Sequence, residues 1–352
     1  MSSKGREAVE LGADVEKVTS LPARTAANVQ VVPGHGIARN PGMKLDLGFL
    51  ESMRGVNRSA LERRAATLNK RRSIKGDNQA AWLLRAIACM DLTTLSSNDT
   101  DERVRRLCAK AVNPLRRDLA EGLGIAGENI RPAAVCVYNP FVAVAVEALR
   151  GSGVHVAAVS TAFPHGLAPL DTRLREIEAS VRDGAGEIDV VIRRGLVFEA
   201  KWPELYDEIA AFRAACGEAH LKVILGTGDL STLRNVTLAS MVAMMAGADF
   251  IKTSTGKESV NATLPVGLAM VRAIRAYFEE TGFLVGFKPA GGISTAKTAL
   301  DWLILMKEEL GRPWLEPALF RFGASSLLTD IERQLEHHLT GHYSAKHRHA
   351  LA

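Results

Sequence analysis

Charged side chains stand inside several short apolar runs of this sequence, where burial is costly unless the charges are paired or functional. Three of them are lysines: Lys222 in LKVILG, Lys252 in ADFIKTS and Lys288 in LVGFKP. A neutral lysine amine can attack a carbonyl carbon and form a Schiff base, whereas an ammonium group has no lone pair. The residue types therefore indicate covalent catalysis on a carbonyl compound, provided that the fold lowers the pKa of one lysine.

The apolar runs alternate with amphipathic helical stretches from residue 86 onward. Strands are predicted at 86–92, 133–138, 154–160, 187–192, 221–226, 248–254, 284–289 and 319–323. Eight strand-then-helix units favour an α/β fold, a (β/α)8 TIM barrel with an N-terminal helical extension. The main alternative is an open doubly wound sheet, but DLTTLSSNDT, which follows the first run, lacks the glycines of a dinucleotide-binding loop.

Side chains alternate between two faces along a strand, so each run divides into an outward and an inward set. In EIDVVI the apolar Ile188, Val190 and Ile192 define the outward face, which leaves Asp189 facing inward. The same rule turns five more side chains toward the barrel interior: Asp91, Cys136, Lys222, Lys252 and Lys288.

Lys252 and Lys288 are predicted near the ends of neighbouring strands, which lie about 4.8 Å apart in a sheet. Repulsion between two such ammonium groups should lower the pKa of one of them toward neutrality. Asp91 and Lys222 can equally form a purely structural ion pair. Five ionisable groups on one inward face are nevertheless more than structure alone usually requires.

Small residues follow the last three predicted strands. Gly291 and Gly292 come after the seventh, Ser325 and Ser326 after the eighth, and Thr255-Gly256-Lys257 after the sixth. Backbone N–H groups at such loops bind anions, and the loops after strands seven and eight are the usual phosphate site of a barrel. Each segment alone also fits a plain turn with a helix cap.

Composition narrows the class of protein. The net charge of +5 among 352 residues is a mild excess, and aromatics make up only 5%, so neither favours a nucleic-acid partner. No apolar run has the length and purity of a membrane span, so no membrane partner is expected. The cysteines form no C-x-x-C pair, which favours a reducing, cytoplasmic location: Cys89, Cys108, Cys136 and Cys216.

The chain is expected to contain four parts. Residues 1–44 read as a flexible extension and 45–85 as a helical collar. Residues 86–342 have the length of one barrel, which is typically about 250 residues, and 343–352 form a tail.

Several motifs occur in the order found in the deoxyribose-phosphate aldolases. FIKTSTGK (250–257), GFKPAGGI (286–293), EIDVVI (187–192), MDLTTL (90–95) and FGASSLL (322–328) resemble that family, and IERQLEHHLTGHY resembles its longer, animal-like form. The resemblance implies reversible cleavage of 2-deoxy-D-ribose 5-phosphate to D-glyceraldehyde 3-phosphate and acetaldehyde, in deoxyribonucleoside catabolism. It implies no cofactor and no metal. Another Schiff-base phosphosugar lyase or isomerase on the same barrel is the alternative.

The resemblance also implies roles for individual residues. Lys252 matches the Schiff-base lysine, Lys288 the lysine that perturbs its pKa, and Asp189 the proton-shuttling aspartate. Asp91 and Lys222 match a supporting polar pair, and Cys136 a cysteine near the substrate that is no required nucleophile. The phosphate-binding set adds Thr255, Gly256, Gly291, Gly292, Gly323, Ser325 and Ser326.

Two positions depart from the family pattern. Gly226 stands where shorter members carry a glutamate, which alters polarity near the barrel mouth. Shorter members end in a tyrosine that assists proton transfer, and Tyr343 is the candidate here, although nine residues follow it. The expected partners are small phosphosugars and aldehydes, and the sequence is compatible with a homo-oligomer.

Overall fold

Eight parallel strands form one sheet in the order β7-β6-β5-β4-β3-β2-β1-β8 in a computed structural model, which describes residues 38–71 and 73–349. The strands are β1 (Met90–Thr93), β2 (Ala134–Tyr138), β3 (His155–Ser160), β4 (Glu187–Val191), β5 (His220–Ile224), β6 (Phe250–Lys252), β7 (Gly286–Lys288) and β8 (Phe322–Ala324). The predicted TIM barrel and its eight strands are confirmed. Most of the predicted extension, residues 1–37, lies outside the described residues.

The two ends of the sheet meet through backbone hydrogen bonds between β7 and the segment that leads into β8. Phe287 N donates to Leu319 O at 2.9 Å, and Arg321 N donates to Phe287 O at 3.1 Å. Gly323 N donates to Pro289 O at 2.9 Å. These bonds pair the edge strands, so the sheet closes into a barrel.

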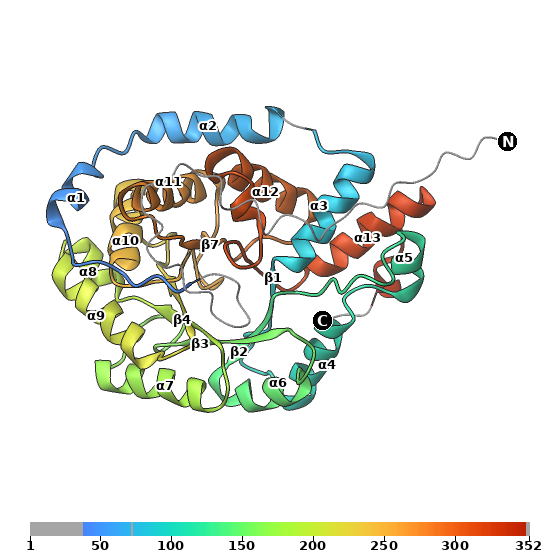
Figure 1. The fold of residues 1–352 in the computed structure, drawn as a ribbon, viewed down its shortest axis with the longest axis horizontal. Coiled ribbons are helices and arrows are strands. Elements are labelled where there is room, and N and C mark those ends of the chain that lie inside the picture. Colours follow the sequence, from blue (N-terminus) through green and yellow to red (C-terminus); the bar gives the residue numbers. More distant parts are fainter. Residues whose placement is uncertain (1–37, 72, 350–352) are drawn as a thin grey trace.

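Helices surround the strands (Figure 1). The helices that follow the strands are α4 (Asp101–Val112), α5 (Arg117–Gly122), α6 (Val142–Ala148), α7 (Leu170–Arg182), α8 (Arg194–Phe198), α9 (Trp202–Ala215), α10 (Leu233–Met245), α11 (Leu264–Thr281), α12 (Ala296–Leu310) and α13 (Leu327–Thr340). Threonines begin three of them: the side chains of Thr100, Thr232 and Thr295 accept backbone N–H groups in the first turns of α4, α10 and α12.

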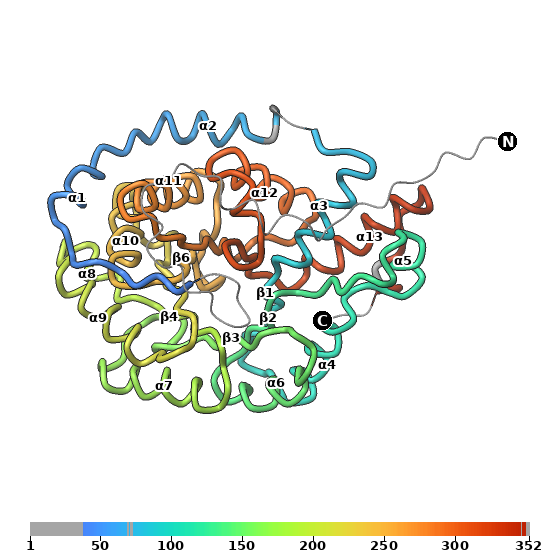
Figure 2. The backbone as a smooth tube through the Cα atoms, in the orientation of Figure 1, coloured from blue at the N-terminus to red at the C-terminus, as the bar shows by residue number. Residues whose placement is uncertain are grey.

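Three further helices precede the barrel: α1 (Leu47–Ser52), α2 (Arg58–Arg71) and α3 (Gly76–Ala88). In Figure 2 the blue α2 runs across α11 and α12, and it contacts both helices. Leu61, Ala65 and Leu68 are the buried face of α2. Arg64 on the same helix forms an ion pair with Glu309 of α12 at 3.0 Å, so this basic side chain stabilises the packing of α2.

The first strand starts later than its apolar run predicted. Residues 86–88 belong to α3, and Cys89 N closes that helix by donating to Arg85 O at 3.0 Å. Ala86 and Ile87 are buried on the same helix face as Leu83, so helical periodicity continues through them. A short apolar run fits a strand or a buried helix end equally well, which is why the sequence misplaced this boundary.

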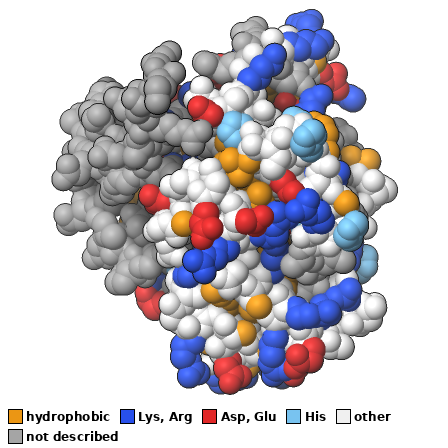
Figure 3. All heavy atoms as spheres, turned by 90° about the vertical axis from the view of Figure 1, so that its right-hand side faces the viewer, with side chains coloured by type: hydrophobic (Ala, Val, Ile, Leu, Met, Phe, Trp, Pro, Cys, Tyr) orange, Lys and Arg blue, Asp and Glu red, His pale blue; other side chains and the backbone are white. Residues whose placement is uncertain are grey.

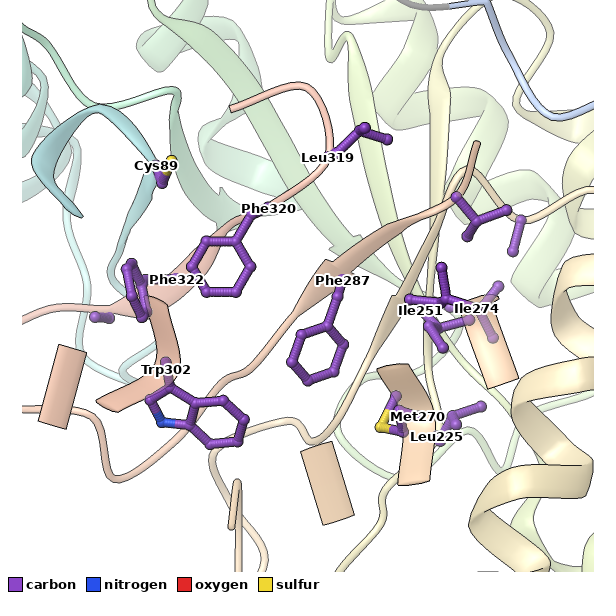
Figure 4. Packing of buried hydrophobic residues seen from close by; sticks show 14 of the residues in the cluster. Cys89, Leu225, Ile251, Met270, Ile274, Phe287, Trp302, Leu319, Phe320 and Phe322 are labelled. Atoms are coloured by element: carbon purple, nitrogen blue, oxygen red, sulfur yellow. The ribbon is translucent and has the colours of Figure 1, made fainter. Parts of the chain in front are cut away.

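Outward-facing strand residues pack against the helices and form the main hydrophobic core. In Figure 4, Phe287 of β7 lies beside Trp302 of α12, and Phe320 lies beside Phe322 of β8. The ring centroids of Phe287 and Trp302 are 5.9 Å apart, and those of Phe320 and Phe322 are 4.7 Å apart. Because this layer occupies one face of every strand, polar strand residues remain for the interior.

The exposed surface carries both signs of charge. On the face in Figure 3, acidic and basic side chains are interspersed. Within residues 38–71 and 73–349, no helix combines the length and the apolar character needed to cross a membrane.

Candidate active site

The five ionisable residues predicted to face inward form one buried cluster. Lys252 Nζ and Lys288 Nζ each lie 2.7 Å from Asp189 Oδ2. Lys222 Nζ lies 2.9 Å from Asp189 Oδ1 and 3.5 Å from Asp91 Oδ2, and Lys288 also forms an ion pair with Asp91. None of the five is more than 3% exposed. The alternation of side chains along the strands therefore located the centre of the barrel interior correctly.

Strand register explains why the two lysines approach each other. Lys252 and Lys288 are directly paired on β6 and β7, and Asp189 and Lys222 are paired on β4 and β5. Lys252 is the last residue of β6 and Lys288 the last residue of β7, so both lie at the carboxyl ends of their strands. Active sites of TIM barrels form at this end.

Two members of the cluster were missed by the sequence analysis. Arg321 Nη2 lies 2.8 Å from Glu187 Oε1, and Arg321 Nη1 lies 2.6 Å from Asp91 Oδ1. Glu187 also forms an ion pair with Lys222. The signal was present: Glu187 shares a strand face with Asp189, and Arg321 alternates with the outward Phe320 and Phe322.

With Arg321 and Glu187 included, the cluster contains more basic than acidic side chains. Four cationic side chains (Lys222, Lys252, Lys288 and Arg321) face three carboxylates (Asp91, Glu187 and Asp189), so full ionisation gives a net charge of +1. Buried charge is stable only when it is paired. Loss of one proton from one lysine would balance the cluster.

Lys252 is the lysine best suited to lose that proton. Burial lowers the pKa of Lys252 most, and the neighbouring Lys288 lowers it further, while Asp189 acts in the opposite direction. Burial also disfavours charge on Lys288, but Asp189 and Asp91 outweigh it and raise the pKa of Lys288. The sequence analysis attributed the shift to lysine–lysine repulsion; burial is the larger cause.

Cys136 faces the interior in a small apolar group beside this cluster. It packs with Leu95, Ala134, Ala157 and Val159, apart from the core that the strands share with the helices. Burial raises the pKa of the Cys136 thiol, so it stays protonated near neutral pH. A protonated thiol is a poor nucleophile.

The predicted phosphate loops lie at the same barrel end as Lys252. Gly256, Gly291 and Gly292 have φ values of +84°, +82° and +79°, a region that favours glycine. A methyl group added at Gly256 would lie 4.0 Å from Gly291 Cα, so the loops after β6 and β7 face each other. A methyl group at Gly292 would meet no atom within 4 Å, whereas one at Gly323 would lie 3.4 Å from Lys288 Cε.

The other predicted phosphate residues lie beside these loops. Ser325 and Ser326 are exposed directly before α13, and the Ser326 side chain does not cap that helix. Thr255 is buried and donates through its N–H and hydroxyl groups to Glu258, a contact that the sequence analysis did not predict.

Tyr343 does not reach the cluster. Its side chain is 64% exposed, and its ring stacks on His337 with centroids 4.1 Å apart, near the end of α13. Barrel helices run antiparallel to the strands, so the end of α13 lies away from the carboxyl ends of the strands. The position of Tyr343 does not support a role as a proton relay.

An arginine fills the space beside Gly226. This glycine has a φ of +67°, and a methyl group there would lie 2.8 Å from Arg194 Nη1. Arg194 forms an ion pair with Asp229 at 3.1 Å. The position where shorter relatives carry a glutamate is therefore beside a guanidinium group in this chain.

A cavity of about 480 Å³ lies at the opposite end of the barrel, where the strands begin. Its lining includes Arg131, His155 and Arg321, but none of the residues predicted for catalysis or phosphate binding. It is separate from the end at which Lys252 lies.

A TIM barrel with a buried lysine pair and an aspartate at the carboxyl ends of its strands has the architecture of a Schiff-base aldolase. The model of the DeoC/LacD family of aldolases matches residues 85–329 of this chain. The chain belongs to this aldolase family, and it is an enzyme.

Individual members of the family with high sequence identity to this chain are deoxyribose-phosphate aldolases. The chain is 57% identical over 312 residues to the human deoxyribose-phosphate aldolase, covering 88% of this chain and 98% of the relative. It is 58% identical over 308 residues to the mouse deoxyribose-phosphate aldolase, with 87% and 96% covered. The resemblance to deoxyribose-phosphate aldolases is thus confirmed.

Solved structures agree on the fold. A putative deoxyribose-phosphate aldolase from Toxoplasma gondii matches with a TM-score of 0.64 at 22% identity, covering 76% of this chain and 98% of that one. A deoxyribose phosphate aldolase from Aeropyrum pernix, described as tetrameric, matches with a TM-score of 0.52 at 22% identity, covering 75% of this chain and 98% of that one.

Proposed function

We propose that this enzyme reversibly cleaves 2-deoxy-D-ribose 5-phosphate to D-glyceraldehyde 3-phosphate and acetaldehyde, through a Schiff base on Lys252 and in deoxyribonucleoside catabolism. The observation that carries the proposal is the environment of Lys252. It is the cluster lysine whose pKa is lowered, it lies at the carboxyl end of β6, and it is 2.7 Å from Asp189. The near-complete coverage of the human and mouse aldolases supports the choice of substrate.

The first half of the reaction forms the covalent intermediate. The neutral Nζ of Lys252 attacks C1 of the open-chain sugar, and the resulting carbinolamine takes up one proton and loses water to give an iminium ion. The final hydrolysis returns that proton. The iminium nitrogen keeps one hydrogen, so Nζ can still donate to Asp189 Oδ2, from which it lies 2.7 Å away in the free enzyme.

The second half breaks the carbon–carbon bond. Asp189, acting through water, accepts the proton of the C3 hydroxyl group; the C2–C3 bond breaks, and its electron pair moves into the enamine. D-Glyceraldehyde 3-phosphate is released, C2 of the enamine takes up a proton, and hydrolysis of the new iminium frees acetaldehyde and Lys252. Lys288, Asp91 and Lys222 keep Asp189 in place throughout.

The substrate's phosphate is assigned to the loops that face each other beyond the strand ends. Its partners are the backbone and side-chain donors of Thr255, Gly256, Gly291, Gly292, Gly323, Ser325 and Ser326. The open space beside Gly292 and the positive φ values of these glycines support this assignment. Cys136 lines the same interior as a protonated thiol. No metal or other cofactor takes part in the proposed reaction.

The proposal also includes a cytoplasmic location and a homo-oligomeric assembly. The proposed partners are small phosphosugars and aldehydes, and they include neither nucleic acid nor a membrane. The four cysteines are free and buried, which supports a reducing compartment. The tetrameric Aeropyrum pernix aldolase supports assembly of a related barrel.

A product assay tests the substrate and separates it from the alternative, another Schiff-base phosphosugar lyase or isomerase. Purified enzyme with 2-deoxyribose 5-phosphate should release acetaldehyde and glyceraldehyde 3-phosphate in equal amounts, and Lys252→Ala should release neither. Consumption of the sugar phosphate without acetaldehyde would support the alternative and contradict the proposal.

A further inference from the structure

Glu258 occupies the turn after β6 in a manner that the proposed chemistry does not require. Its Oε2 accepts hydrogen bonds from Thr255 N at 3.0 Å, Thr255 Oγ1 at 2.8 Å and Gly256 N at 3.2 Å. Glu258 Oε1 accepts a further bond from Thr255 N at 3.1 Å. Three donors thus converge on one carboxylate, and each is a charge-assisted hydrogen bond.

These donors belong to the wall that the proposed function assigns to the substrate's phosphate. The turn lies against the loop after β7, because a methyl group at Gly256 would be 4.0 Å from Gly291 Cα. Asn261 joins the two loops: its Nδ2 donates to Glu258 O at 3.0 Å, and a methyl group at Gly291 would lie 2.6 Å from its Cβ. The Glu258 carboxylate is therefore at the edge of the phosphate cradle.

The partners that the structure describes for this carboxylate are all uncharged. Among residues 38–71 and 73–349, Glu258 takes part in no ion pair, and its partners are backbone and hydroxyl donors. Hydrogen-bond donors without a countercharge form the kind of concave site that also binds phosphate oxygens. An N–H group that already points to Glu258 cannot donate fully to a phosphate at the same time.

We propose that Glu258 is a specificity-determining residue that occupies part of the phosphate cradle as an internal anion and must leave it when a phosphorylated substrate binds. The inference rests on the proposed function, which places the phosphate at this turn. Displacement lowers the apparent affinity for any phosphate-bearing ligand, because the ligand must replace an anion that is already bound. A sugar without phosphate does not need these donors, so Glu258 leaves its binding unaffected.

Glu258→Gln is the informative variant, because it keeps an oxygen acceptor of the same shape and removes the charge. A neutral acceptor bonds more weakly to the same donors, and it does not repel a phosphate. We expect the KM for 2-deoxyribose 5-phosphate to fall roughly tenfold, which corresponds to the loss of about one strong hydrogen bond. The kcat for this substrate, and the KM for unphosphorylated 2-deoxyribose, should change by no more than about twofold.

Direct binding of inorganic phosphate, measured by isothermal titration calorimetry, keeps this test separate from the identity of the substrate. The Kd should fall roughly tenfold in Glu258→Gln and stay unchanged in Glu279→Gln, a matched exposed glutamate on α11. A failure of the proposed function would appear as absence of acetaldehyde, whereas the calorimetric comparison would still report on Glu258. An unchanged or weaker phosphate affinity in Glu258→Gln would overturn the inference, because it would mean that the carboxylate only supports the turn.

Discussion

Lys252 and Lys288 occupy paired positions on β6 and β7, and the Nζ atoms of both lie 2.7 Å from the same atom, Asp189 Oδ2. One carboxylate oxygen thereby fixes the positions of two lysines whose pKa values move in opposite directions. The pKa of Lys252 is lowered by burial and by Lys288, and the pKa of Lys288 is raised by Asp189 and Asp91 despite its burial. The arrangement favours loss of a proton from Lys252 and keeps a positive charge on Lys288 beside it.

Asp189→Asn tests the role of this shared carboxylate. An amide cannot accept the C3 proton, so kcat should fall by about 10²- to 10⁴-fold, the usual contribution of a general base. Steady-state release of acetaldehyde is the measurement, and circular dichroism checks that the variant is folded. Asp183→Asn, an exposed aspartate before β4, is the control and should keep full activity. Activity of Asp189→Asn within a few-fold of the wild type would remove Asp189 from the mechanism.

Lys288→Met should shift the pH profile of kcat/KM. Catalysis needs the neutral amine, so the rate falls as the pH drops below the pKa of Lys252, which Lys288 helps to lower. Without the positive charge of Lys288 this pKa rises, and the acid limb should move to higher pH. Lys288→Arg keeps the charge, so its limb should stay near that of the wild type. A limb that moves to lower pH in Lys288→Met would contradict the electrostatic role.

Acid should destabilise the fold through the buried carboxylates. Arg321 and Lys222 outweigh the burial of Glu187 and hold its pKa well below 4.5, so its stabilising contribution is present above the unfolded-state pKa and is lost as pH falls through the folded value. Glu187→Gln removes this pH-dependent contribution and leaves Arg321 and Lys222 less well paired. We expect a loss of about 3–5 kcal/mol in the free energy of unfolding at neutral pH, and a shallower decline below about pH 4 than in the wild type.

Urea unfolding followed by circular dichroism across roughly pH 3–7 measures both effects. Glu178→Gln, an exposed site on α7, should change the free energy of unfolding by no more than about 0.5 kcal/mol. Equal acid sensitivity of Glu187→Gln and wild type would show that Glu187 is not a source of the pH dependence.

The two glycines after β7 should respond differently to alanine. Both have positive φ values, so each substitution costs about 1–2 kcal/mol in backbone strain. The methyl group of Gly291→Ala would in addition lie 2.6 Å from Asn261 Cβ, whereas that of Gly292→Ala would enter open space. Thermal unfolding should therefore rank Gly291→Ala as the less stable variant.

The KM for 2-deoxyribose 5-phosphate completes this comparison. The methyl group of Gly292→Ala projects into the space proposed for the phosphate, so the KM should rise although the loss of stability is the smaller of the two. An unchanged KM in this variant would place the phosphate elsewhere.

Strand alternation predicted the centre of this site because it is a local property of the backbone. Knowing that Ile188 and Val190 face the helices is sufficient to turn Asp189 inward, and the same holds for Lys222, Lys252 and Lys288. Glu187 and Arg321 obey the same rule and could have been found with it. The roles of these residues remain predictions that the experiments above address.

Features that depend on contacts between separate segments could not be predicted from the sequence. The helix α3 extends to Ala88 because its buried face continues through Ala86 and Ile87, which no local pattern separates from a strand. Contact between Glu258 and the Thr255–Gly256 turn depends on loop conformation. Tyr343 stacks on His337 at the end of α13, and this contact depends on how the segment after α13 turns back on the helix.

Trapping the covalent intermediate tests the central claim most directly. Sodium borohydride reduces an iminium ion to a stable secondary amine, so enzyme treated with borohydride and 2-deoxyribose 5-phosphate should gain the mass of the reduced adduct. Peptide mass spectrometry should place that adduct on Lys252, and Lys252→Ala should gain no mass. An adduct on Lys222 or Lys288 in the wild type, or the absence of any adduct during turnover, would contradict the account.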